Sequence, residues 1–310
     1  MPQSKGLLRG GESVGLYKLL QVAQMSNPIG DSKAILDQDR LLVQHQAALT
    51  LLQSRVQNPK VKDFHWLDLA CGRGQIIVHL DGNLTPAARG KISYHIYDVR
   101  AGYVSTTRRK ADLLGFKSVS QTTDSLEKID THLNRRELFD FITFTNTVHE
   151  LSPKLVASTL VSCVLMLKQK GSLYVYDFES FPPEEHELGA IVWTRAEIQS
   201  ITGAMLTALG VKGYQPEVGH WRQKSCTGWN IHIEQEHFDC SREELVKQAN
   251  AATVATEATM REILKVKQEQ TRQVLNSFTE NAPETLQERE ERTAALFSFW
   301  ALTRALEAQP

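Results

Sequence analysis

Residues 66–75 read WLDLACGRGQ, and this stretch limits the possible folds more than any other part of the chain. An apolar run typical of a buried strand ends at two glycines spaced by one residue, and a helix-like apolar run follows. Gly72 and Gly74 permit positive φ and carry no Cβ, so the backbone can turn sharply after Ala70 and approach a ligand closely. A strand, a glycine turn and a helix in this order predict a nucleotide-type binding turn in an α/β sheet.

The stretch from residue 61 to residue 238 repeats the alternation of strand and helix. Four short runs have the character of buried strands: FHWLDLA, KISYHIYDV, FDFITFTN and SLYVYDF. Helical patterns cover 74–80, 102–115, 153–168 and 194–209, and the last of these begins with a capping box, Thr194–Glu197. Two later runs, VKGYQPEVGHWR and GWNIHIEQEHF, resemble a terminal antiparallel pair. This order favours an α/β fold whose mostly parallel sheet is covered on both faces.

Helical segments flank this stretch at both ends. Residues 1–60 have helical spacing with a break at Asn27–Asp31, and residues 241–310 contain no glycine. Ser241 and Glu244 match a second capping box, which predicts a long helix to about residue 280 and then another helix ending in FSFWALTRAL. That run is too apolar for a free tail, so it must pack on the main domain, the N-terminal helices or another subunit. We predict three zones with bounds 1–60, 61–238 and 241–310.

The composition is that of an ordinary folded protein. The net charge is −1 and 41% of the residues are hydrophobic, which argues against disorder and against strong polyanion binding. The four cysteines form no C-x-x-C pair, so we expect neither a disulfide framework nor a metal site, and their use suits a reducing cytoplasm. No stretch approaches the roughly 20 apolar residues that span a bilayer, and no secretory signal is evident. We therefore expect a cytoplasmic protein.

The glycine turn does not match the common phosphate-binding fingerprints. A dinucleotide site would continue as G-x-G-x-x-G, but Gln75, Ile76 and Ile77 follow Gly74, which disfavours an NAD oxidoreductase. A Walker loop is excluded because no G-K-[ST] follows. Asp68, near the end of the strand, is awkward beside a pyrophosphate but suits a ligand that carries an ammonium group.

The run DLACGRG resembles the first motif of the S-adenosylmethionine (SAM)-dependent methyltransferases of the Rossmann-like class I family. The resemblance covers about 61–238. It implies a Rossmann-like, mostly parallel seven-stranded sheet with a terminal antiparallel hairpin, and SAM as the cofactor. It also implies that the turn, with Ala70, Cys71, Gly72 and Gly74, packs against the methionine and ribose parts of SAM, while Asp68 helps to hold the amino group.

Three later positions extend the resemblance. Asp98 ends the second strand, where the family has an acid that accepts from the ribose hydroxyls, and Val99 follows it in the same site. Asp124 and Ser125 fall where a polar group contacts the adenine amino group, and Asn146 falls where the fourth strand meets the methyl-donor pocket. Each of these residues also has an alternative explanation that does not involve SAM. An NAD enzyme would also use an acid at the position of Asp98, and either aspartate could be a helix cap. Cys71 could be a packing residue, and the turn an ordinary βα connection.

His149 and Glu150 are the candidate catalytic residues. Methyl transfer from a sulfonium needs the nucleophile, methyl carbon and sulfur in line, and a general base assists hydroxyl or ammonium acceptors. Histidine titrates near neutral pH, and Glu150 could orient the acceptor. The N-x-x-H-E arrangement is similar to that of several small-molecule methyltransferases. The alternative is that His149 caps the strand–helix junction, and only one of two adjacent side chains easily faces the pocket.

Missing motifs narrow the range of possible methyl acceptors. Asn146 to His149 do not form the [DNS]-P-P-[YFW] motif of amino-DNA methyltransferases, so DNA is not expected. The basic residues Arg100 and Arg108–Lys110 are interpreted as a solvated face. We favour a small-molecule acceptor, with a protein or RNA group as the next choice.

Two further points complete these expectations. By analogy with the family, the N-terminal helices with Tyr17 form a lid, and the C-terminal helices complete it, form a homodimer or bind a partner protein. The rival from another class is a non-catalytic or partner-dependent binding or assembly module on the same fold.

Overall fold

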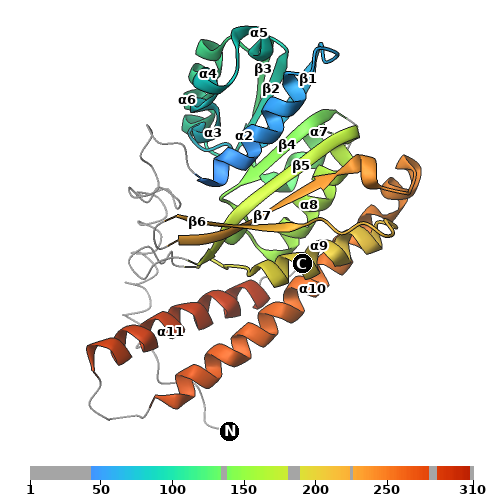
Figure 1. The fold of residues 1–310 in the computed structure, drawn as a ribbon. Helices are drawn as coiled ribbons and strands as arrows, with labels where there is room; N and C mark the ends of the chain where they lie inside the picture. The colour runs from blue at the N-terminus through green and yellow to red at the C-terminus, as the bar shows by residue number, and fades with distance from the viewer. Residues whose placement is uncertain (1–42, 134–137, 181–188, 224–225, 279–284, 308–310) are drawn as a thin grey trace.

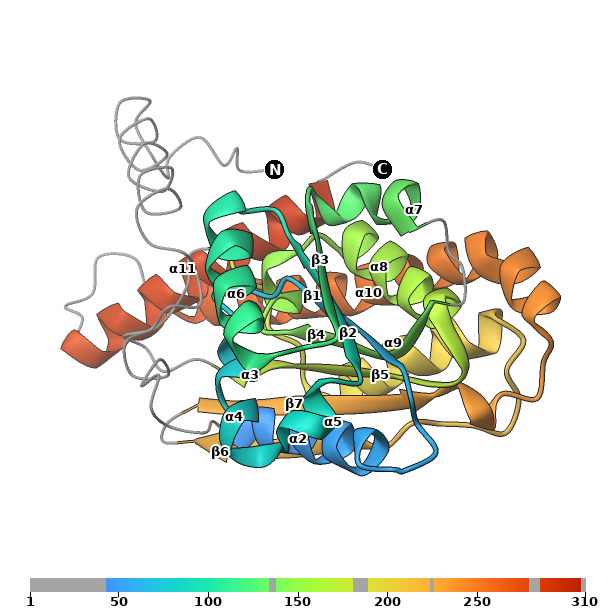
Figure 2. The ribbon, with the colours of Figure 1, turned by 90° about the horizontal axis from the view of Figure 1, so that it is seen from above.

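The computed structural model describes residues 43–133, 138–180, 189–223, 226–278 and 285–307. Most of the predicted N-terminal lid, including Tyr17 and Asn27–Asp31, lies outside these residues. Figures 1 and 2 show the chain from two directions.

Seven strands form one sheet in the order β3-β2-β1-β4-β5-β7-β6. The strands β1 to β5 pair in parallel, and β7 runs antiparallel to both β5 and β6, which confirms the predicted fold class. Their bounds are Phe64–Leu69, Ile92–Asp98, Ser118–Thr123, Phe139–Thr145, Leu167–Ser180, Val218–Gln223 and Cys226–Glu234 for β1 to β7. The strand order reverses between β1 and β4, so ligands are expected at the carboxyl ends of these two strands.

The edge strand β3 was not among the predicted strands. Its sequence, SVSQTT, carries one apolar residue, and its side chains are exposed or only half-buried. It pairs with β2 on one side only, so few of its side chains needed to be apolar. Apolar periodicity alone could not identify it.

Helices cover both faces of the sheet. One face carries α2 (Val43–Val56), α3 (Gln75–Val78), α4 (Leu80–Asn83), α5 (Pro86–Arg89) and α6 (Ala101–Leu114). The other carries α7 (Ile129–Leu133), α8 (Pro153–Met166), α9 (Arg195–Ala208) and α10 (Arg242–Ser277). Figure 2 shows α2 and α8 on opposite sides of the sheet. The helix predicted over 74–80 is interrupted at His79, where α3 ends and α4 begins.

Both predicted capping boxes are present. The Thr194 hydroxyl accepts from the Glu197 N–H at 3.3 Å and the Glu197 carboxylate accepts from the Thr194 N–H at 2.7 Å, with the same pattern at Ser241. The capped helix α10 packs on α8 and α9, and α11 (Leu286–Glu307) lies beside it (Figure 1). Leu302 and Ala305 of α11 join the main core cluster, and α11 packs chiefly on α10, which lies against α8 and α9. The division into three zones stays a prediction.

Within the described ranges, every helix is too short or too polar to cross a membrane.

Candidate functional site

The carboxyl edge of β1 and β4 holds two residues in a left-handed backbone conformation. Ala70 and Asn146 both have φ 51°, and among the described residues no other non-glycine residue has positive φ. For residues with a Cβ this conformation costs roughly 1–2 kcal/mol, and such strain concentrates at functional sites. Gly72 and Gly74 continue the turn with φ of 54° and 71°, and a Cβ on Gly74 would lie 3.0 Å from the Thr107 hydroxyl. The turn therefore has the backbone shape that the sequence predicted.

Asp98 joins this turn to the end of β2. Its Oδ2 accepts from the Gly72 N–H at 3.0 Å, and its Oδ1 accepts from the Arg100 N–H at 2.8 Å. The side chain is 7% exposed, and burial raises its pKa from the ordinary value. The Thr107 hydroxyl donates to the Gly72 carbonyl at 2.9 Å and holds the turn from the other side. A carboxylate is thus fixed directly beneath the turn.

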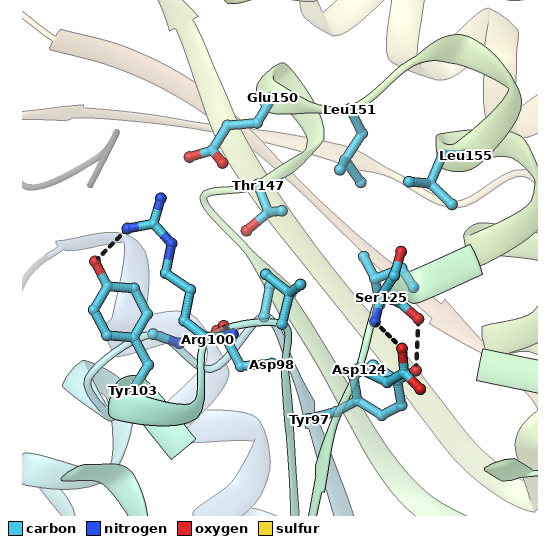
Figure 3. A pocket seen from close by; sticks show the side chains of 14 residues that line it. Tyr97, Asp98, Arg100, Tyr103, Asp124, Ser125, Thr147, Glu150, Leu151 and Leu155 are labelled. Carbon is cyan, nitrogen blue, oxygen red and sulfur yellow. Dashed lines mark hydrogen bonds between the residues drawn. The ribbon is translucent and has the colours of Figure 1, made fainter. Parts of the chain in front are cut away.

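A pocket opens above Asp98, between the ends of β1, β2 and β4 (Figure 3). Its lining residues are Ala70, Gly72, Tyr97, Asp98, Val99, Arg100, Tyr103, Asp124, Ser125, Leu126, Thr147, Glu150, Leu151 and Leu155. The structure therefore brings together most of the predicted cofactor residues, with Val99 exposed by 64% on one wall. Asp68, Cys71, Gly74, Asn146 and His149 are not part of this lining.

Asp124 and Ser125 form the wall of the pocket opposite Arg100 (Figure 3). The Asp124 carboxylate accepts from His132 Nε2 at 2.9 Å and from the Ser125 N–H at 2.8 Å, and Lys128 lies 3.1 Å away. The bond from His132, followed by that from Ser125, lowers the pKa of Asp124 to about 2. The helix-cap role falls to Ser125, whose hydroxyl accepts from the Glu127 N–H of the 3-10 turn Leu126–Lys128.

Asp68 lies below the pocket in a closed network. Its Oδ1 accepts from the Thr143 hydroxyl at 2.7 Å and its Oδ2 accepts from the Tyr94 hydroxyl at 2.6 Å, while Trp66 Nε1 donates to Thr143 at 2.9 Å. The residue is 1% exposed, and burial raises its pKa to about 6. Both oxygens are already used inside the protein, so contact with an ammonium group stays a prediction.

His149 is held by Asp177, a residue that the sequence analysis missed. The Asp177 carboxylate accepts from His149 Nδ1 at 2.6 Å, from the His149 N–H at 2.9 Å and from the Phe178 N–H at 2.7 Å. The side chains of His149 and Asp177 are 0% and 1% exposed. A signal was present, because Asp177 is the one acid in the apolar run SLYVYDF of β5.

Glu150, in contrast, lines the pocket. It ends the short 3-10 helix Val148–Glu150, which His149 and Asp177 anchor to β5. The Glu150 carboxylate lies 3.9 Å from His149 Nε2. Of the two adjacent candidates, the one that faces the pocket is therefore Glu150.

Three predicted residues surround the turn without lining the pocket. Cys71 is buried, and burial raises the pKa of its thiol, so it packs rather than reacts. Gly74 precedes α3 as its N-cap. Asn146 donates its N–H to the Tyr176 carbonyl at 3.0 Å, and its buried Oδ1 has no hydrogen-bond partner among the described residues.

Arg100 occupies a wall of the pocket instead of a purely solvated face. Its guanidinium donates to the Tyr103 hydroxyl at 3.1 Å and stacks 5.2 Å from the centre of the Tyr103 ring. Arg73 stacks on the same ring at 5.5 Å. Spacing gave no signal for this arrangement, because it depends on how α6 packs against the turn.

A second ionisable group lies at the opposite edge of the sheet. Glu234, Glu236 and His237 come within 4.8 Å of one another at the end of β7, beside the start of β5. Glu234 pairs with Arg55 at 3.0 Å, so a cation already neutralises this carboxylate. The group is remote from the carboxyl edge of the parallel strands.

The strand order, the antiparallel end and the pocket at the carboxyl edge give the chain the Rossmann-like fold expected of class I methyltransferases. No protein-family model matches the sequence, and no curated protein matches it.

Among solved structures, the chain is similar to the 1,6-didemethyltoxoflavin-N1-methyltransferase of Burkholderia thailandensis, at 15% identity and a TM-score of 0.48 over 75% of this chain and 93% of the other. It is similar to the magnesium protoporphyrin IX methyltransferase of Synechocystis PCC 6803, at 14% identity and a TM-score of 0.46 over 72% and 95%. It is also similar to an rRNA methylase of Streptococcus thermophilus, at 13% identity and a TM-score of 0.39 over 63% and 98%.

Proposed function

We propose that this protein is a methyltransferase that takes its methyl group from SAM and transfers it to a small molecule. The observation that carries the proposal is Asp98, held beneath the glycine turn by the N–H groups of Gly72 and Arg100 and exposed to the pocket. A carboxylate at the end of the second strand accepts from ribose hydroxyls in nucleotide-binding sheets. With the ribose placed at Asp98, the pocket walls and the glycine turn can be assigned to the other parts of SAM.

The size and walls of the pocket support a nucleoside. Its volume is about 210 Å³, whereas pockets for complete drug-sized ligands span roughly 300–1,000 Å³. Val99 and Leu126 supply apolar surface for a planar ring, and Asp124 and Ser125 supply polar groups at its rim. Together with the missing third glycine, this favours the adenosine part of SAM over a dinucleotide.

The residues at the turn fit the rest of the cofactor. Gly72 and Gly74 let the backbone approach it closely, and Asn146 lies at the end of the neighbouring strand, where the methyl donor would meet its acceptor. When bound, SAM supplies a methyl group on a sulfonium, which an acceptor displaces in line. In this proposal Glu150 contacts the acceptor or takes its proton, and His149 with Asp177 holds Glu150 in place.

Calorimetric titration with SAM, S-adenosylhomocysteine (SAH) and NAD tests the proposal. We expect SAM and SAH to bind and NAD not to bind. Asp98→Ala should weaken SAH binding about 100-fold, because hydrogen bonds to a charged group contribute roughly 1.5–3 kcal/mol each. Asp112→Ala is the matched control, since Asp112 forms only a surface pair with Arg108 on α6. It should bind SAH within about twofold of the wild type.

The outcomes separate the candidates. Equal SAH affinity in Asp98→Ala, with thermal unfolding that shows an intact fold, would contradict the ribose assignment. SAM binding without transfer of a labelled methyl group to any small molecule would favour the binding or assembly module. Transfer to RNA or protein would keep the reaction and change the acceptor.

A further inference from the structure

Three polar side chains near the turn end in buried atoms that have no hydrogen-bond partner among the described residues. They are His45 Nδ1 from α2, Asn146 Oδ1 at the end of β4 and Tyr176 Oη from β5. His45 is 2% exposed and Tyr176 is 0% exposed. Buried polar groups are nearly always paired, so each such atom calls for an explanation.

The three residues form one cluster. The rings of His45 and Tyr176 meet edge to face, with their centroids 5.6 Å apart. The Tyr176 carbonyl accepts from the Asn146 N–H at 3.0 Å, where β5 runs beside the end of β4. The cluster therefore lies at the carboxyl edge of the sheet, the edge that also carries the pocket.

Other buried polar atoms also lack partners, but not in this arrangement. Thr159 Oγ1 and Ser162 Oγ are unpaired hydroxyls on a single helix, α8, within the main core. The three atoms at the sheet edge come instead from three neighbouring segments, and one of them belongs to the strained residue Asn146. Polar groups brought together from different elements are typical of a binding site.

The chemistry of the three groups limits what they can bind. Burial, reinforced by the nearby His79, lowers the pKa of His45 to about 3, so its imidazole is neutral at physiological pH. Burial raises the pKa of the Tyr176 phenol well above its ordinary value, and the neighbouring Thr145 side chain offsets only part of this rise, so the phenol is neutral too. The Asn146 oxygen accepts only, whereas a neutral imidazole nitrogen and a phenol hydroxyl can each accept. The phenol can also donate, so the cluster offers up to three acceptor atoms and no charge.

We propose that His45, Asn146 and Tyr176, here called the acceptor cradle, bind the methyl acceptor through its O–H or N–H groups. The acceptor is accordingly an uncharged molecule with hydroxyl or amine donors, and an anion finds no cation in the cradle. This inference rests on the proposed function, because it places the acceptor beside the cofactor turn.

Small aromatic probes test the cradle in the full-length protein saturated with SAH. Phenol and aniline carry a donor, anisole has similar size without one, and benzoate is an anion. Ligand-observed NMR titrations should give affinities for phenol or aniline about tenfold above those for anisole and benzoate, the ratio expected for one buried hydrogen bond. Equal affinities for phenol and anisole, or binding of none of the probes, would overturn the proposal.

Two variants separate binding from folding. Tyr176→Phe and His45→Leu should lower the affinity for phenol or aniline about tenfold while SAH affinity stays within about twofold. Their melting temperatures should not fall, because no hydrogen bond is lost. Ser162→Ala is the control, and it should leave probe binding unchanged. Unchanged probe affinity in both cradle variants, or a clear loss of stability, would overturn the proposal. Failure of the wild type to bind SAH would refute the proposed function instead. The same probe titrations on the protein without SAH would then test whether the acceptor cradle binds donor-carrying molecules.

Discussion

Two buried polar clusters lie on the same face of the sheet, and they differ in how fully their atoms are paired. Below β1, Asp68 accepts from Tyr94 and Thr143, and Trp66 donates to Thr143, all within 2.9 Å. Beside the end of β4, His45 Nδ1 of α2 and Tyr176 Oη of β5 have no described partner. All these side chains are buried to a similar degree. Burial therefore does not distinguish the two clusters, whereas their hydrogen bonding does, and only the second keeps buried polar atoms available for a ligand.

Among fully hydrogen-bonded buried groups, we expect the largest loss of stability on substitution of Asp177. Asp177→Ala removes three hydrogen bonds and leaves the buried His149 Nδ1 without its carboxylate. We expect a loss of about 3–5 kcal/mol in the free energy of unfolding, measured by urea denaturation. Asp112→Ala, at the surface of α6, should change it by less than about 1 kcal/mol. A loss below that control would show that the buried pair is dispensable.

The charge of Asp68 gives the next largest effect, and it depends on pH. Burial raises its pKa from 3.8 to about 6, so ionisation is disfavoured in the folded state. Asp68 therefore stabilises the fold most below pH 4, and this contribution is lost as pH rises through 6. The wild type should lose about 2.5 kcal/mol relative to Asp68→Asn between pH 4 and pH 7. Urea unfolding at both pH values measures this, and parallel pH profiles of the two proteins would contradict it.

A pair of tyrosine variants compares the two clusters directly. Tyr94→Phe removes a hydroxyl that donates to Asp68 at 2.6 Å, so it should lower stability by about 1.5–3 kcal/mol. Tyr176→Phe removes an unpaired hydroxyl, so it should change stability by less than about 0.5 kcal/mol or increase it. Both values come from the same urea experiment. If the two variants lose equal stability, pairing does not distinguish the clusters.

The smallest effect is expected on α8. Ser162 is fully buried with an unpaired hydroxyl, and it is not among the residues that line the carboxyl-edge pocket. Ser162→Ala should raise stability by about 0.5 kcal/mol, because alanine has the better helix propensity and no hydrogen bond is lost. Differential scanning calorimetry would detect the change, and a clear decrease would reveal a bond through buried water.

The sequence predicted the sheet where strands were apolar and the turn where geometry required glycine. β1, β2, β4 and β7 fall close to their predicted runs, because burial on both faces demands apolar residues. The strand β3 was not predicted because an edge strand does not need an apolar run. The helix 74–80 breaks at His79, which depends on packing that local propensity does not contain.

From the sequence, we identified residues at strand ends that line the pocket but missed partners across strands, and the roles of the pocket residues stay predictions. Gly72, Asp98 and Val99 follow from topology, because parallel strands bring their carboxyl ends together. The bonded state of Asp68 depends on the register that sets it opposite Thr143, and single-sequence reading does not supply that register. The link between Asp177 and His149 spans two elements in the same way. Contacts of this kind require the three-dimensional pairing.

The polar edge strand β3 has a consequence for behaviour in concentrated solution. An open sheet edge presents unpaired backbone groups that can recruit the edge of another molecule and seed aggregation. Here the exposed edge carries serine, glutamine and threonine side chains, and Arg108 covers the Val119 carbonyl at 2.8 Å. The polar composition that hid β3 from hydrophobic pattern analysis should therefore also make this edge a poor template for association.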